Sequence, residues 1–152
     1  MTNYKDKPWF QFLDHSMQDL AKTSYILLDL LEIENWKLKI GEIHDFSFVV
    51  FPLAKTYEGF LKKWLFTNHL IDERDYLSDH FRLGKALNPS LEKKFRGHDY
   101  VYDKIVANYS DPHLADRLWD AWKQCRNLVF HYFPNHQHFI TTIAAAQARL
   151  DQ

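Results

Sequence analysis

The residues best suited to chemistry stand late in the chain, where Arg126 and Asn127 precede His131 by a few positions. An arginine guanidinium donates a fork of hydrogen bonds that matches phosphate oxygens. A histidine has an ordinary pKa of about 6.5, so it can accept or release a proton near neutral pH. These side chains therefore suit the cleavage of a phosphodiester, in which protons move while negative charge develops on the phosphate.

The helix that must carry these residues is expected to face the core through Leu118 and Cys125. At 100° per residue, this core face places Arg126 to one side of an outward arc and His131 to the other. Asn127 then lies nearly opposite the core. The spacing predicts that all three side chains point away from the protein interior.

Phe130 falls on the same outward arc, and a purely solvated helix face would seldom present an aromatic ring. We interpret Phe130 as part of a partner surface. The alternative is that Arg126 and His131 are only cations near a helix C-terminus, which the helix dipole favours by roughly 0.3–1 kcal/mol. Chance is a further alternative, because Arg74 and His80 have a similar spacing in a weakly helical stretch.

The basic run Lys93, Lys94 and Arg96 is a second candidate, either for contacts to an RNA backbone or for plain solvated surface. Phe95 within it could stack on a base or belong to the core. No metal site is predicted, because His131, His136 and His138 straddle Pro134 at no usual zinc spacing. No cofactor is implied either.

A second helix could complete the site, because Lys55, Tyr57 and Glu58 would line a cleft if their helix faced Arg126. The competing interpretation places Tyr57 in the core, since it keeps the helical period of the apolar residues.

Apolar residues at alternating steps of three and four indicate helices over 13–31, 46–65 and 112–132. Weaker patterns indicate helices over 76–87, 99–109 and 138–150. Pro52 should kink the second helix or mark its true start. Asp111 is expected to cap the 112–132 helix, with Pro112 in its first turn and Pro134 ending it.

The composition fits one all-α domain over residues 1–152, built as a compact bundle of about four to six helices. The 152 residues are 46% hydrophobic and include only 4 Gly and 5 Pro, too few turn formers for a sandwich or barrel. The formal net charge of −1 excludes a global positive field that would attract nucleic acid. Any contact with RNA must therefore be local.

The cysteine content and the apolar runs predict a cytoplasmic protein with no membrane segment. The chain has a single cysteine, Cys125, which therefore cannot form an internal disulfide. The N-terminus has no stretch like a secretion signal. The longest uncharged apolar run, 46–54, is far shorter than the roughly 20 residues of a membrane span.

Arg126, Asn127 and His131 resemble the motif of the HEPN-domain ribonucleases, in which an arginine and a polar residue precede a histidine near the end of a late helix. The segment Leu53 to Leu65 is also similar to the HEPN part of RNase LS-type toxins, and the resemblance covers about residues 45–135. It implies an all-helical homodimer that cleaves RNA without a metal, with Arg126 and His131 catalytic and Asn127 binding or orienting.

The resemblance further implies a toxin or antiviral effector with an antitoxin protein as a further partner. HEPN toxins that are modified by nucleotidyltransferase antitoxins carry Tyr two positions after the histidine, where this chain has Phe133. The alternative function is a non-catalytic HEPN-like helical module that binds a protein partner or a nucleotide. In that case the motif serves only dimer contacts.

Overall fold

The computed structural model of the chain describes residues 4–33, 41–131, 134 and 138–151. Every regular element in these ranges is helical, which confirms the predicted all-α class. The α-helices are α1 (Pro8–Phe12), α2 (His15–Glu32), α4 (Ser47–Thr67), α5 (Glu73–Leu77), α6 (Leu83–Ala86), α7 (Tyr102–Asn108), α8 (Leu114–Trp122) and α9 (Ile143–Leu150). The 3-10 turns η1 (Tyr4–Asp6) and η2 (Lys93–Phe95) and the π-helical segment η3 (Lys123–Asn127) complete the described elements.

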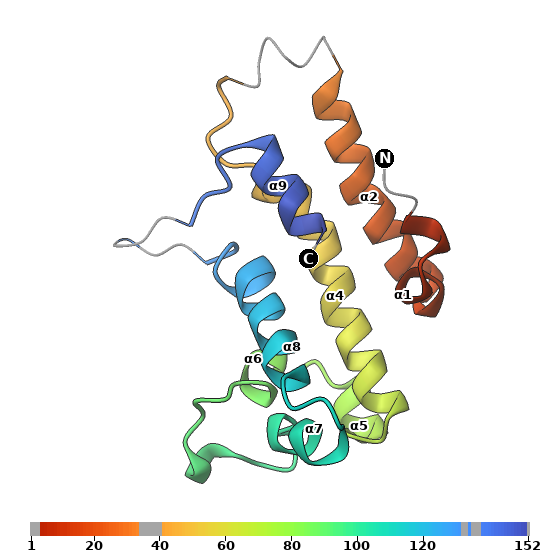
Figure 1. Cartoon of the computed structure of the whole chain (residues 1–152), viewed down its shortest axis with the longest axis vertical. Coiled ribbons are helices and arrows are strands. Elements are labelled where there is room, and N and C mark those ends of the chain that lie inside the picture. Colours follow the sequence, from red (N-terminus) through yellow and green to blue (C-terminus); the bar gives the residue numbers. More distant parts are fainter. Residues whose placement is uncertain (1–3, 34–40, 132–133, 135–137, 152) are drawn as a thin grey trace.

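Helix α4 is the central element of the bundle (Figure 1). It lies antiparallel to α2 on one side, and α8 with η3 flanks it on the other. Helix α9 packs across the first half of α4 and also contacts α2. Figure 1 places the short helices α5, α6 and α7 around the far end of α4 and the start of α8.

Two apolar clusters share α4 as their common wall. Near its N-terminus, Val49 and Val50 pack with residues of α2 and α9. Near its C-terminus, Leu61 and Leu65 pack with residues of α6, α7 and α8. Helix α4 therefore connects the two ends of the bundle by contributing buried residues to both clusters.

Pro52 lies inside α4 and does not mark its start, since the helix begins at Ser47. A proline interrupts the backbone hydrogen-bond ladder of a helix. The next backbone N–H, that of Leu53, donates to the Ser24 hydroxyl oxygen of α2 at 3.0 Å. The fully buried Ser24 therefore satisfies a main-chain donor beside the proline.

Several predicted helix boundaries are wrong. The 76–87 helix is replaced by α5 and α6 with a non-helical stretch between them. Asp111 accepts a bond from the His113 N–H at 3.0 Å and so closes a turn, and α8 begins only at Leu114. The last helix begins at Ile143, because the Thr142 hydroxyl caps it by accepting from the Ala145 N–H at 3.0 Å.

The segment that leads into α9 is fastened to the segment that leads into α4. The Phe46 N–H donates to the Ile140 carbonyl at 2.8 Å, and the Ile140 N–H donates to the Asp45 carboxylate at 3.1 Å. Within the described part of the chain, no helix is long and apolar enough to cross a bilayer.

Candidate functional site

The helix that carries Arg126 ends earlier than its apolar period predicts. After Trp122 the backbone widens into the π-helical segment η3, in which the Leu128 N–H donates to the Lys123 carbonyl at 2.9 Å. The chain leaves the helix after Asn127, so His131 lies in a bend. The expected rotation of 100° per residue from Leu118 to His131 is therefore wrong, because a π turn holds more residues than an α turn.

The buried face of α8 also differs from the expected one. Ala115 and Trp122 are the buried residues of this helix, whereas Leu118 and Cys125 are only half-buried. The Trp122 ring packs closely on Gly84 of α6, where a Cβ atom would lie 2.4 Å from the indole. This contact fixes the rotation of α8 just before η3 begins.

Arg126 points toward α4 at the molecular surface. Its Nε lies 3.2 Å from Glu58 Oε1, and the two side chains are 33% and 30% exposed. Its guanidinium carbon lies 5.8 Å from the centre of the Trp122 ring. An ion pair this exposed contributes about 0–1 kcal/mol to stability, so its main effect is to orient the guanidinium.

Glu58 belongs to a line of residues along α4, Phe48, Phe51, Lys55 and Glu58, which we call the α4 face. Phe48 and Phe51 are 42% and 47% exposed. The Phe130 ring meets Phe51 edge-on, with centroids 5.1 Å apart, and Lys55 Nζ lies 5.6 Å from the Phe51 centroid. Arg126 therefore sits beside a partly exposed aromatic surface, and Phe130 belongs to this surface.

Asn127 and His131 lie on the same stretch of chain as Arg126. Asn127 is half-buried at the end of η3, and His131 is exposed. A bond from the Phe130 N–H to the Arg126 carbonyl, at 3.2 Å, holds the turn between them. Tyr132, Phe133 and His136 lie outside the described residues.

Tyr57 is more a core residue than a site residue. Its hydroxyl donates to the Leu118 carbonyl at 3.1 Å, and burial raises its pKa well above the ordinary tyrosine value. The neighbouring Glu58 is the residue of this segment that meets Arg126, as expected if the two helices face each other.

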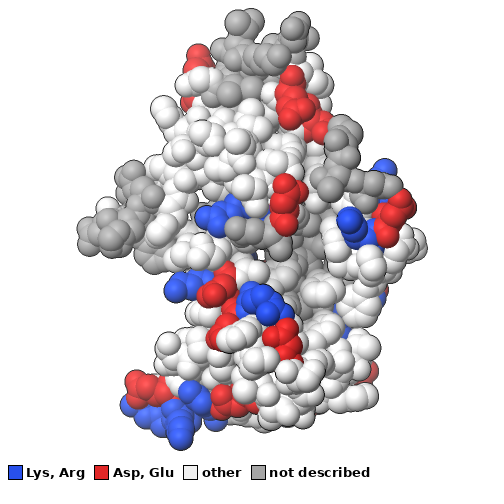
Figure 2. All heavy atoms as spheres, in the orientation of Figure 1, with Lys and Arg blue, Asp and Glu red and all other residues white. Residues whose placement is uncertain are grey.

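The basic run lies away from Arg126. Figure 1 places η2 near the opposite end of α8 from η3. Arg96 is engaged locally, with Nη1 2.8 Å from Asp103 and Nε donating to the Leu91 carbonyl at 2.9 Å. Lys94 pairs with Glu92 at 2.7 Å, and Lys93 is exposed. Figure 2 shows acidic and basic side chains intermingled over this face of the molecule.

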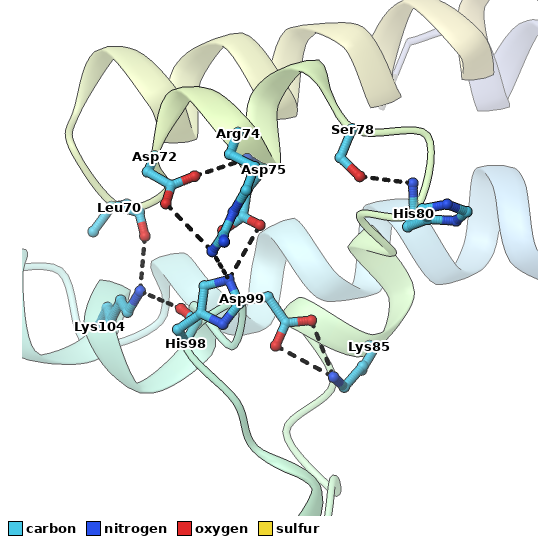
Figure 3. A network of polar contacts seen from close by, with 10 residues as sticks. All are labelled: Leu70, Asp72, Arg74, Asp75, Ser78, His80, Lys85, His98, Asp99 and Lys104. Carbon is cyan, nitrogen blue, oxygen red and sulfur yellow. Dashed lines mark hydrogen bonds and ion pairs between the residues drawn. The ribbon is translucent and has the colours of Figure 1, made fainter.

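A separate polar network joins α5 to the segment before α7 (Figure 3). His98 Nε2 lies 3.3 Å from both Asp75 Oδ1 and Arg74 Nη2, although the residues are far apart in sequence. Lys104 Nζ bridges the Leu70 and His98 carbonyls at 2.9 and 2.7 Å. Arg74 thus faces His98 and not His80, and the network ties these segments together.

Among the described residues, no three His, Cys, Asp or Glu side chains are grouped closely enough to hold a metal ion.

No family model, no curated protein and no solved structure shows detectable similarity to the chain.

Proposed function

We propose that the protein is a metal-independent endoribonuclease that acts as a homodimer, with Arg126 and His131 as its catalytic residues. The HEPN-like motif suggests this activity. The observation that supports it best is the position of Arg126, which is held by Glu58 and Trp122 at an exposed surface beside the aromatic rings of Phe51 and Phe130.

The ion pair suits Arg126 for phosphate binding. Glu58 contacts Nε and so fixes the plane of the guanidinium. The guanidinium carries further N–H donors on its two Nη groups. A phosphate of the RNA backbone can accept hydrogen bonds from these donors.

RNA supplies its own nucleophile for the cleavage. The 2′-oxygen forms a bond to phosphorus, and the bond from phosphorus to the 5′-oxygen breaks. A base takes the 2′-hydroxyl proton and an acid protonates the leaving oxygen, and histidine suits both roles. One chain has one His131, so a two-fold dimer would supply the pair. Asn127 would bind or orient the RNA.

The test is cleavage of a defined RNA in buffer with a chelator. The wild-type protein should yield fragments with a 2′,3′-cyclic phosphate and a 5′-hydroxyl. His131→Ala and Arg126→Ala should each lose about 10²-fold or more in rate. His113→Ala and Arg117→Ala are matched controls, because these residues are exposed at the other end of α8. Both controls should cleave like the wild type.

Cleavage that persists in His131→Ala, or that stops with the chelator, would overturn the mechanism. The exposed apolar residues of the α4 face equally suit the alternative function, a helical module that binds a protein partner. Absence of cleavage by a dimeric preparation would favour that alternative.

A further inference from the structure

A cleft lies between the N-terminal segment and the elements that carry Arg126 and Glu58. Its volume is about 660 Å³, and it is lined by the N-terminal segment, α2, α4, α8 with η3, and the end of α9. The residues that precede the ion pair in sequence, Tyr57 and Cys125, line this cleft. Arg126 and Glu58 themselves are not among the residues that line it.

The walls of the cleft are mostly apolar and aromatic. Trp9, Tyr25, Leu53 and Phe60 line it, and each of them is only half-buried. The Tyr4 ring stacks on Tyr25 with centroids 3.9 Å apart and planes 7° apart, which gives one wall a flat surface. Cavities of roughly 300–1,000 Å³ with such walls typically hold small organic molecules.

The charged residues of the lining favour an acidic ligand. Lys7 and Arg149 contribute two cations, and Asp151 contributes one anion. Arg149 acts on the Cys125 side of the cleft, where its charge opposes the upward effect of burial on the pKa of the thiol. Asp151 acts on the Tyr25 side, where it adds to the effect of burial in raising the pKa of that phenol. Cations therefore outnumber anions in the lining by two to one.

We propose that this cleft is a binding site for a small organic acid, whose flat apolar body packs among Trp9, Tyr25 and Phe60 and whose anionic group meets Arg149. The site does not depend on the proposed ribonuclease activity. Alkylation of Cys125 can report whether the cleft is occupied, because Cys125 lines the cleft and is the single cysteine of the chain.

The experiment measures how three probes with one ring system slow the alkylation of Cys125 by iodoacetamide. The probes are 2-naphthoate, 2-naphthalenemethanol and 2-naphthylmethylamine, which carry a negative, a neutral and a positive group. For each variant, the alkylation rate without probe is divided by the rate with probe, and these protection ratios are compared between the probes. Naphthoate should protect saturably, with an apparent affinity about tenfold higher than that of the alcohol, and the amine should protect least.

Two variants test the site. Ala121→Phe should fill the cleft and abolish protection, whereas Ala107→Phe, at an exposed position on α7, should not. Arg149→Met should remove the preference for the acid over the alcohol, whereas Arg117→Met should keep it. Circular dichroism checks that each variant is folded. The proposal is overturned if naphthoate gives no saturable protection, if the alcohol protects equally, or if Arg149→Met retains the preference.

Discussion

The ion pair between Arg126 and Glu58 is the point where two distant segments meet at the candidate site. Its two side chains are about one-third exposed, so its contribution to the free energy of unfolding is small. Its contribution to geometry is larger, because it restricts a side chain that would otherwise sample many rotamers.

Variants of Glu58 should distinguish its effect on the orientation of the Arg126 side chain from the effect of its negative charge. Glu58→Ala removes the carboxylate that pairs with Arg126 Nε, and we expect RNA cleavage to fall by about tenfold, equivalent to about 1.4 kcal/mol of transition-state stabilisation. Glu58→Gln keeps an acceptor oxygen and should retain most of the activity. Denaturant titration should show that neither variant changes the free energy of unfolding by more than about 1 kcal/mol. Equal activity losses in both variants would contradict the orienting role.

The Cys125 thiol should titrate at a higher pH in the folded chain than in the unfolded chain. Burial raises its pKa and Arg149 opposes part of that rise. Because the thiolate is the reactive form, the alkylation rate of the native protein should keep rising at a pH where that of the urea-unfolded chain has levelled off. Arg149→Met should move the native profile to still higher pH. Identical profiles for native and unfolded chains would contradict this.

At the scale of elements, two buried hydroxyl side chains bond to the backbone of α4 around Pro52. The buried Ser24 hydroxyl accepts the Leu53 N–H, and the Thr56 hydroxyl donates to the Pro52 carbonyl at 3.1 Å. Ser24 falls within the predicted first helix, but apolar spacing does not predict a hydrogen bond to its side chain. Its polar role depends on the irregularity of the neighbouring helix.

Ser24→Ala should therefore destabilise the protein more than an ordinary serine truncation. The substitution leaves the Leu53 N–H without its buried acceptor, which costs about 1–3 kcal/mol. Ser16→Ala is the matched control, because Ser16 is exposed on the same helix. Its effect should stay within about 0.5 kcal/mol. Urea titrations of the two variants make the comparison, and similar midpoints would argue against the hydrogen bond to Ser24.

At the scale of the whole molecule, the exposed aromatic residues of the α4 face predict self-association. Phe48 and Phe51 are exposed on α4, and Phe130, which follows Arg126 by one turn, packs against Phe51. A two-fold contact through this surface would bring two copies of the motif together.

Light scattering at micromolar concentration should therefore show a dimer, and Phe51→Glu should convert it to a monomer. Leu77→Glu is the control, because Leu77 is 70% exposed on α5, away from the α4 face. It should leave the dimer intact. A monomeric wild type, or a dimer that persists in Phe51→Glu with undiminished affinity, would remove the support for a composite site.

The sequence by itself determined the all-α class and the two long helices now seen as α2 and α4, because apolar spacing depends only on local geometry and on burial of one face. It also placed Arg126, Asn127 and Phe130 near the end of a late helix. The sequence could not determine where that helix ends, because the apolar spacing that includes Leu128 is compatible with either an α turn or a π turn. The boundaries of the shorter helices, such as α5 and α6, were likewise beyond local patterns, since tertiary packing decides marginal helices.

Only the tertiary structure decided which residues meet. The partnership of Arg126 with Glu58, the contact of Phe130 with Phe51 and the bond between Leu53 and Ser24 all join segments that are distant in sequence. The cleft around Tyr57 and Cys125 is a further case, since both residues keep the period of core positions yet line a cavity. A periodic pattern specifies that a side chain faces inward, but only the packing of several elements determines whether the space it faces is filled.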